Sequence, residues 1–253
     1  MPTNKQRREA AQRRLQRQLE RREELNRKRR RNLLIGVTVV AVLAVVGAFF
    51  IITSLGSDDE GDTASQASDD ATCTFTPDGS GDDVGTPDSE PPTTGTATLA
   101  IGTSAGDIGL ALDQANAPCA SASFVYLAGE GFFDGTSCHR ETASESLKVL
   151  QCGDPTGTGT GGPGYSFPTQ VTGSETYPRG TLAMANAGQG TDGSQFFLVY
   201  GDSQLPPDYT VVGTIDQAGL AVLDQVAAVG IADGATDGAP AQPVTIDSMT
   251  VVQ

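Results

Sequence analysis

A strand–loop–strand stretch, RGTLAMANAGQGTDGSQFFLVYG at residues 179–201, carries polar side chains suited to binding an extended peptide. Alternating apolar residues at 181–185 predict one strand, and the apolar run at 196–200 predicts another. The three glycines between them favour a loop with several positive-φ positions. Asn186 and Gln195, at the two ends of this loop, could hydrogen-bond a peptide backbone in a groove. The spacing alone favours a simpler interpretation, an ordinary edge loop of a β protein.

His139 is the only histidine of the chain and follows Cys138, a pair that suggests thiol-protease or zinc chemistry. The four cysteines, at positions 73, 119, 138 and 152, show no paired C-x-x-C spacing, which argues against both. The glycine-rich run at 157–164 lacks the Gly-Lys-Ser/Thr ending of a phosphate-binding loop and is interpreted as an irregular surface loop. We therefore expect no metal and no cofactor.

Four motifs, taken together and in this order, resemble those of the cyclophilins, the peptidyl-prolyl isomerases with a closed eight-stranded barrel. They are His139-Arg140, the run QCGDP at 151–155, the run GTGTGGPGY at 157–165, and MANAG followed by GSQFF between 184 and 197. The resemblance covers roughly residues 96–252. It implies a mainly β fold, a closed barrel capped by two helices, and prolyl isomerase activity.

Prolyl isomerisation explains which residue types such a site needs. An X–Pro bond isomerises slowly because amide resonance creates a barrier of about 18–20 kcal/mol. A donor aimed at the prolyl nitrogen or carbonyl would stabilise the twisted bond, in which the nitrogen gains a lone pair. A thousandfold acceleration requires about 4 kcal/mol. A charged hydrogen bond supplies about 1.5–3 kcal/mol of this, and a preorganised groove can supply the rest.

The resemblance also implies a role for individual residues. Arg140 matches the catalytic arginine of the family, and Gln151, on the next predicted strand, matches the residue that orients its guanidinium. Other positions match the walls of the peptide groove and the floor of the proline pocket. These implied substrate-binding residues are Ala185, Asn186, Ala187, Gln195, Phe197, Leu205, Tyr209 and Val149.

The segment between Arg140 and Gln151 departs from the family pattern. It is about three residues longer and lacks the usual proline-glycine-phenylalanine-methionine run. Lys148 falls where the pocket phenylalanine is expected, and Gln204 where a tryptophan often grips the drug cyclosporin. Tyr209 replaces a histidine. The altered pocket leaves open a second function, a non-catalytic proline-peptide-binding or chaperone module on the same scaffold.

Charge divides the 253-residue chain into two unlike parts. Residues 1–31 hold 13 Lys or Arg and four Glu, a charge of +9, whereas residues 32–253 hold three basic and 27 acidic residues, a charge of −24. These two parts account for the net charge of −15. Such asymmetry indicates different compartments for the two parts.

The basic part is expected to be a helix, because residues 4–31 lack Gly and Pro and carry Glu/Arg pairs four residues apart, such as Glu9/Arg13. It is expected to lie near anionic lipid. No aromatic residue or recognition motif accompanies it, so no nucleic-acid partner is expected. A weaker alternative makes this helix the functional part and the barrel an attached sensor.

A membrane span is predicted at residues 32–55. Positions 33–55 contain no charge, Asn, Gln or Pro. As a helix they would measure roughly 34 Å, against a bilayer core of about 30 Å. No A-x-A site follows, which favours a retained anchor over a cleaved signal peptide. The basic flank places residues 1–31 in the cytoplasm and the rest outside. The combination of this anchor with the barrel motifs resembles membrane-anchored bacterial, actinobacterial-like forms of the family.

Residues 56–95 are rich in Asp, Ser, Thr, Gly and Pro and are predicted to form a disordered acidic linker, part of which Cys73 and Phe75 could pin to the folded domain. The folded domain is expected at 96–253. Its strands are predicted at 96–103, 107–112, 136–140, 147–153, 181–185, 196–200, 209–215 and 244–252, and its helices at 119–128 and 220–228. Eight strands suit a closed barrel, which leaves no exposed edges.

Outside the membrane the four cysteines are expected to form disulfides, for which the sequence allows three connectivities. Cys138 and Cys152 lie on strands that are expected to be neighbours, which favours 138–152 and leaves 73–119. The chain is thus predicted to be a monomeric prolyl isomerase, anchored in the cell membrane. Its expected substrates are exported or unfolded proline-containing polypeptides.

Overall fold

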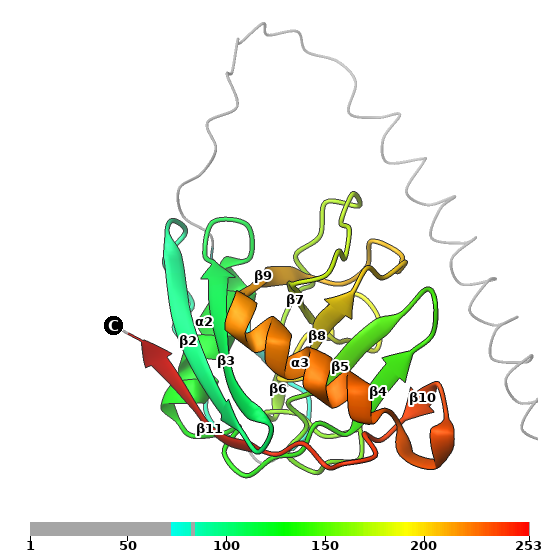
Figure 1. Ribbon diagram of the computed structural model, residues 1–253. Helices are drawn as coiled ribbons and strands as arrows, with labels where there is room; N and C mark the ends of the chain where they lie inside the picture. Colours follow the sequence, from blue (N-terminus) through cyan, green and yellow to red (C-terminus); the bar gives the residue numbers. More distant parts are fainter. Residues whose placement is uncertain (1–71, 82–83, 253) are drawn as a thin grey trace, which may run out of the picture. The chain divides into compact units, whose positions relative to one another are not determined.

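The computed structural model describes residues 72–81 and 84–252 (Figure 1). The basic helix predicted at 1–31 and the membrane span predicted at 32–55 lie outside these residues. Within the described ranges, no helix combines the length and the apolar character needed to cross a membrane.

Nine strands of the described chain form one strongly curled antiparallel sheet, in the order β10-β4-β5-β8-β7-β9-β3-β2-β11 (Figure 1). In chain order the strands are β2 (Thr96–Thr103), β3 (Gly106–Asp113), β4 (Arg140–Ala143), β5 (Lys148–Cys152), β7 (Thr181–Met184), β8 (Phe196–Gly201), β9 (Val211–Ile215), β10 (Asp237–Gly238) and β11 (Ile246–Val252).

This sheet has one strand more than the eight that were predicted. The extra strand is β10, which pairs with β4 and is too short to show an apolar alternation. The strand predicted at 136–140 begins only at Arg140, because the residues before it bond to the chain that leads into β11. The N–H of Cys138 donates to the carbonyl of Val244 at 2.9 Å, and the N–H of Ile246 donates to the carbonyl of Thr136 at 2.8 Å. These bonds connect the two ends of the curled sheet.

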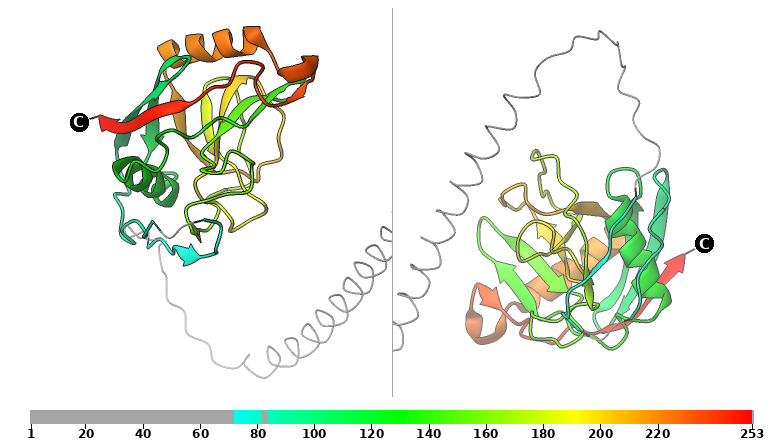
Figure 2. Two further views of the ribbon diagram at one scale, coloured as in Figure 1. Left: turned by 90° about the horizontal axis from the view of Figure 1, so that it is seen from below. Right: turned by 180° about the vertical axis from the view of Figure 1, so that it is seen from behind.

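The two predicted helices are present as α2 (Pro118–Gly129) and α3 (Gln217–Val229), and both are longer than predicted. Figure 2 shows them apart from each other, and both contribute side chains to the core that the curled sheet encloses. Pro118 opens α2, where a missing backbone donor costs nothing. Asp216 caps α3 by accepting the N–H of Gly219. A short 3₁₀ helix, η1 (Ala232–Gly234), follows α3 and leads to β10.

The core fills the inside of the curled sheet. Phe124 of α2 contacts Phe196 of β8 and Phe133, with ring centroids 5.2 Å and 5.9 Å apart, and all three rings are at most 1% exposed. Because side chains alternate along a strand, Phe196 and Leu198 of β8 face this core, whereas Phe197 and Val199 belong to a second apolar cluster. β8 therefore supports both the core and the second apolar cluster.

The described part of the predicted disordered linker is instead held against the domain. Cys73 forms a disulfide with Cys119 of α2, and β1 (Thr76–Pro77) pairs with β6 (Tyr165–Ser166). The ring of Phe75 lies edge-on to Tyr165, with centroids 5.4 Å apart. A covalent link and aromatic contacts offset the ordering entropy that the composition alone would not overcome.

Candidate active site

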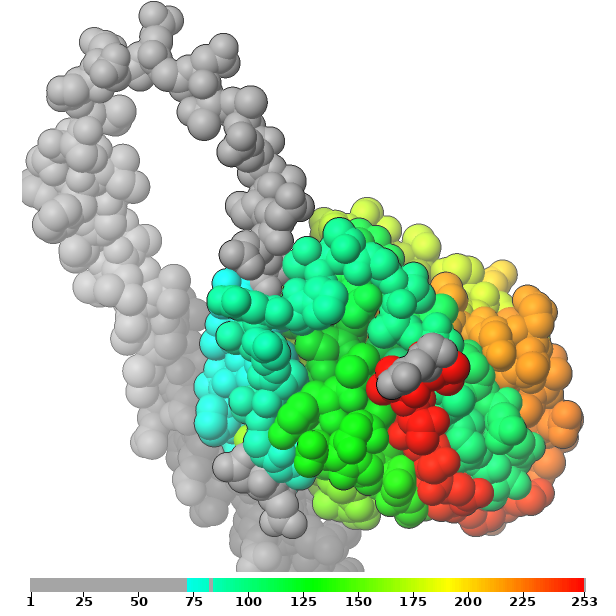
Figure 3. Space-filling view, turned by 90° about the vertical axis from the view of Figure 1, so that its left-hand side faces the viewer, coloured from blue at the N-terminus to red at the C-terminus, as the bar shows by residue number. Residues whose placement is uncertain are grey.

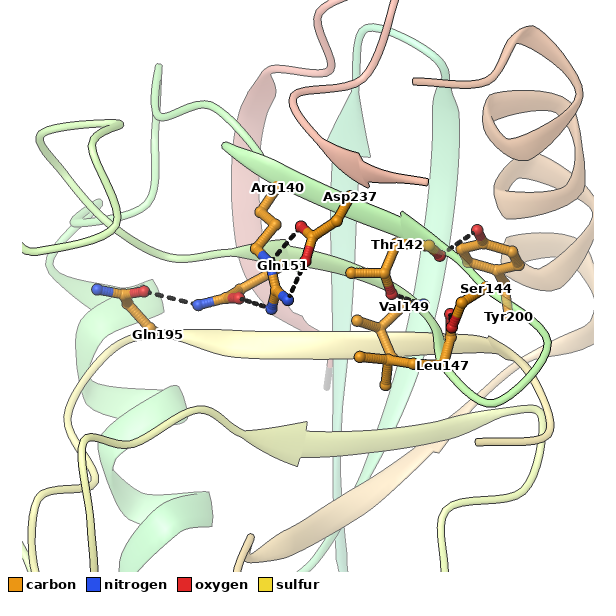
Figure 4. A network of polar contacts seen from close by, with 9 residues as sticks. All are labelled: Arg140, Thr142, Ser144, Leu147, Val149, Gln151, Gln195, Tyr200 and Asp237. Carbon is orange, nitrogen blue, oxygen red and sulfur yellow. Dashed lines mark hydrogen bonds and ion pairs between the residues drawn. The ribbon is translucent and has the colours of Figure 1, made fainter. Parts of the chain in front are cut away.

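The pairing of β4 with β5 sets Arg140 directly opposite Gln151. Nη1 of Arg140 donates to Oε1 of Gln151 at 3.2 Å (Figure 4). The disulfide Cys138–Cys152 flanks these two residues, and with Cys73–Cys119 it confirms the predicted connectivity. The contact that the resemblance implied for Gln151 is therefore present, on two paired strands, and the disulfide links β5 to the residues just before β4.

Asp237, which the sequence did not single out, holds the other side of the guanidinium (Figure 4). Its two carboxylate oxygens accept from Nε and Nη2 of Arg140, both at 2.8 Å. This ion pair raises the pKa of Arg140 and lowers that of Asp237. The two side chains are 39% and 56% exposed, so water limits the strength of the pair. No local sequence signal identifies Asp237, because only the short strand β10 brings it to β4.

From Gln151 a chain of side-chain amides leads into a groove of about 440 Å³. Nε2 of Gln151 donates to Oε1 of Gln195 at 3.0 Å, and Nε2 of Gln195 donates to the carbonyl of Gly161 at 2.9 Å. The groove brings together five of the predicted site residues, namely Gln151, Ala185, Asn186, Ala187 and Gln195. Its facing wall is residues 159–163, part of the run interpreted from the sequence only as a surface loop.

Asp154, which is fully buried, organises this glycine-rich wall. Its carboxylate accepts from the backbone N–H groups of Thr156 at 2.7 Å and of Thr158 and Thr160 at 3.0 Å, and also from that of Gly159. Burial by itself would raise the pKa of Asp154, but these donors lower it below its ordinary value. The QCGDP motif thus supplies both Gln151 and the carboxylate that shapes the opposite wall.

Asn186 braces the wall of the groove as well as lining it. Its Nδ2 donates to Oδ1 of Asp192 at 3.0 Å and to the carbonyl of Asp208 at 3.1 Å. Asp192 is fully buried and also accepts from the hydroxyls of Thr169 and Thr210. Burial raises the pKa of Asp192. The side chain of Asn186 thus links its own loop to the segment at Asp208, which stiffens the backbone of residues 185–187.

The second apolar cluster lies on the strands that carry Gln151 and its neighbours. Four predicted pocket residues, Phe197, Leu205, Tyr209 and Val149, belong to it. The rings of Phe197 and Tyr209 meet edge to face, with centroids 5.6 Å apart. The other members are Tyr177, Ala183 and Val199, with partly buried Leu147, Ala185 and Val211 around them.

Tyr177 is a large member of this cluster that sequence analysis did not single out, whereas Leu147 was expected from the sequence as a possible apolar contributor. Tyr177 is 2% exposed, and its hydroxyl donates to the carbonyl of Tyr209 and accepts the N–H of the same residue, both at 3.0 Å. Leu147, rather than Lys148, contacts the cluster, and the alkyl chain of Lys148 lies over Gly201. The two-residue period of a strand places Leu147 on the same face as Val149. The surface therefore stays apolar where a lysine was expected.

His139 is half-buried against Gly159, and neither of its ring nitrogens has a hydrogen-bond partner among the described residues. Burial lowers the pKa of His139, partly opposed by the charge of Asp154. All four cysteines are in disulfides. In residues 72–81 and 84–252, no three His, Cys, Asp or Glu side chains gather in a way that could hold a metal ion.

The fold is a curled antiparallel barrel. Arg140 lies between the polar groove and the second apolar cluster, which is called the apolar patch below. This combination defines a class of protein. Residues 98–251 match the family described as cyclophilin type peptidyl-prolyl cis-trans isomerase/CLD, and the chain belongs to this family.

Three similar proteins support this assignment. The chain is 54% identical over 166 residues to the probable peptidyl-prolyl cis-trans isomerase B of Mycobacterium leprae (61% of this chain, 56% of that protein). It is 45% identical over 134 residues to a peptidyl-prolyl cis-trans isomerase of Helicobacter pylori (52% and 80%). It superposes with a TM-score of 0.53 and 28% identity on a Cryptosporidium parvum cyclophilin crystallised in the presence of the dipeptide Ala-Pro (62% and 99%). The chain spans little more than half the length of the mycobacterial relative.

Proposed function

We propose that the domain catalyses the cis–trans isomerisation of X–Pro peptide bonds. The observation that carries this proposal is the guanidinium of Arg140, fixed from two sides by Gln151 and Asp237 beside an apolar patch. The proline ring would pack on the patch around Phe197, and the flanking backbone would lie in the groove lined by residues 185–187. Arg140 would then donate to the prolyl nitrogen or carbonyl as the bond twists.

The energetics are consistent with this role. A hydrogen bond from a charged donor contributes about 1.5–3 kcal/mol, and about 4 kcal/mol suffices for a thousandfold acceleration. Because Gln151 and Asp237 already hold the guanidinium, little side-chain entropy is lost in the transition state. The names of the relatives, and the presence of Ala-Pro with the Cryptosporidium protein, support a prolyl peptide as the ligand of this chain as well.

An isomerisation assay on the full chain, paired with a direct peptide titration, tests the proposal. We expect the protein to accelerate the cis-to-trans conversion of an Ala-Pro-containing peptide well above the uncatalysed rate. The alternative, a non-catalytic proline-peptide-binding or chaperone module, predicts binding of the same peptide with no acceleration. That second outcome would refute the enzymatic function but would still support a proline-peptide-binding site.

We further propose that this domain assists the folding of exported proteins at the outer face of the cell membrane, as a monomeric, single-pass, actinobacterial-like form of the family. The apolar run at 33–55 and the change from +9 to −24 across it support this location. The basic segment at 1–31 would lie on the cytoplasmic side, against anionic lipid. The mycobacterial relative supports the bacterial assignment.

Protease added to intact cells or protoplasts tests this orientation. We expect it to release a fragment that contains the barrel and to leave an epitope tag at the N-terminus protected. The control is a cytoplasmic protein of the same cells, which has to remain intact. A tag that is digested from outside would contradict the orientation.

A further inference from the structure

The segment before the barrel forms one wall of the peptide groove. After β1, the N–H of Asp78 donates to the carbonyl of Gly164 at 3.1 Å, and the carbonyl of Ser80 accepts the N–H of Gly162 at 2.9 Å. The hydroxyl of Ser80 accepts the N–H of Gly164 at 3.2 Å. These bonds place Asp78 and Ser80 in the lining of the groove, next to residues 159–163. Part of the groove therefore comes from outside the stretch that matches the family, which begins at residue 98.

This wall is fixed in place. The disulfide Cys73–Cys119 anchors it to α2, and the ring of Phe75 packs against Tyr165 and Phe167 with centroid distances of 5.4 Å and 5.6 Å. Figure 3 shows the cyan segment lying against the green residues of the domain. A side chain on this wall consequently keeps a defined position relative to the groove.

Asp78 gives the groove its charge. It is the one ionisable side chain among the described residues that line the groove. Its Oδ1 accepts the N–H of Ser80 at 2.8 Å, which holds the carboxylate in an Asx turn. Its Oδ2 accepts no hydrogen bond from the described residues, and the side chain is exposed. One carboxylate oxygen is therefore available to a ligand.

The groove joins this carboxylate to the proposed catalytic arginine. Gln151 lines the groove and also binds Arg140. Ala185 belongs both to the groove and to the apolar patch. A peptide whose proline packs on the patch therefore extends one flank along the groove towards Asp78.

We propose that Asp78 is a specificity-determining residue that selects substrates with a lysine or arginine near the proline. This inference rests on the isomerase function proposed above. A cationic side chain would pair with the free carboxylate oxygen, and an acidic one would be repelled. Because Asp78 is exposed, the effect is modest and decreases with added salt.

The test uses the full chain and peptides with a single Lys, Ala or Glu at each position from three before to three after the proline. We expect kcat/KM to be about three times higher for Lys than for Ala at one or more positions of one flank, and lower for Glu. Asp78→Asn keeps the Asx-turn acceptor and removes only the charge, so this Lys/Ala ratio is expected to fall to about one.

Asp88→Asn is the matched control, because it removes the same charge from the same segment at a residue outside the groove lining. The charge of −24 on residues 32–253 attracts any cationic peptide. Asp88→Asn reduces this general attraction as much as Asp78→Asn does, and it should leave the Lys/Ala ratio unchanged. A ratio that is equal in wild type and Asp78→Asn, or a ratio of one at every position in wild type, would overturn the inference. Binding titrations with the same peptides distinguish this inference from the isomerase function. A preference in binding that depends on Asp78, without catalysis, would refute only the isomerase function.

Discussion

The guanidinium of Arg140 has three of its N–H groups engaged, two by Asp237 and one by Gln151. An arginine side chain carries five N–H donors in a rigid plane, so two remain for a substrate. The ion pair with Asp237 is exposed to water on both sides and therefore contributes little to stability. Its proposed role is to orient Arg140, because it fixes the plane in which the remaining donors point.

Asp237→Asn tests this geometric role. The variant keeps one acceptor oxygen but loses the charge and one of two hydrogen bonds, so the guanidinium gains freedom. We expect kcat to fall about three- to tenfold and KM to change less than twofold, because the apolar patch is untouched. Asp224→Asn is the control, since Asp224 forms an ion pair with Arg179 of nearly the same exposure and should leave kcat unchanged. An undiminished kcat in Asp237→Asn would show that Asp237 is not a positioning residue.

Glu141, next to Arg140 in the chain, faces the core and is fully buried. Its Oε2 has no hydrogen-bond partner among the described residues, and its Oε1 lies 3.5 Å from the hydroxyl of Tyr200. Burial raises the pKa of Glu141, and burial together with Glu141 raises the pKa of Tyr200 to about 12. The folded protein therefore binds a proton at Glu141 more tightly than the unfolded chain does.

A raised pKa in the folded state means that the contribution of Glu141 to stability is present at low pH and is lost as the pH rises through the folded pKa. Glu141→Gln removes this loss. We expect the variant to unfold at about the same denaturant concentration as wild type near pH 4, and to be more stable by about 1–3 kcal/mol near pH 8. If the free energies of unfolding of the two proteins changed with pH in parallel, this result would contradict a buried, proton-binding Glu141.

At the scale of elements, the disulfide Cys138–Cys152 joins β5, which presents Gln151, to the segment just before β4, which presents Arg140. In the chain-entropy model, a cross-link between residues 14 apart contributes about 3 kcal/mol. Replacing both cysteines by serine should lower the free energy of unfolding by about this amount, and should also lower kcat. Replacing Cys73 and Cys119 is the control, because it should cost at least as much stability but leave kcat on an Ala-Pro peptide nearly unchanged. Equal losses of kcat in both variants would contradict a specific link to the site.

The elements that sequence analysis predicted are those with a local signal. The alternation at 96–103 and 181–185, and the helical spacing at 119–128, identified β2, β7 and α2 to within about two residues. The connectivity of the cysteines followed from two strands expected to be neighbours. The motif positions from Arg140 to Tyr209 do gather around one groove and one apolar patch.

The features that were missed depend on contacts between distant parts of the chain. Asp237 reaches Arg140 across 97 positions through a two-residue strand. Tyr177 joins the apolar patch from a loop. Composition predicted disorder for the segment around Asp78, and a disulfide with aromatic packing holds that segment in place instead. No local pattern encodes such pairings, so they require the folded chain.

At the scale of the whole molecule, the domain supports two surfaces with one set of strands. Phe196 and Leu198 of β8 stabilise the core, while Phe197 and Val199 of the same strand contribute to the patch. The proposed catalytic and binding residues thus lie on a rigid scaffold, which favours a preorganised site. This arrangement predicts that binding and catalysis can be impaired separately, by changing the patch or the guanidinium.

The isomerisation rate of Arg140→Ala, measured beside peptide affinity, tests this account most directly. We expect the catalysed rate to fall by roughly 10- to 1,000-fold, which corresponds to losing about 1.5–4 kcal/mol of transition-state stabilisation, with a much smaller change in affinity. Phe197→Ala should instead weaken binding, and Arg179→Ala, which removes an arginine away from the groove and the patch, should change neither. An Arg140→Ala protein as active as wild type would contradict the central claim that this guanidinium stabilises the twisted prolyl bond.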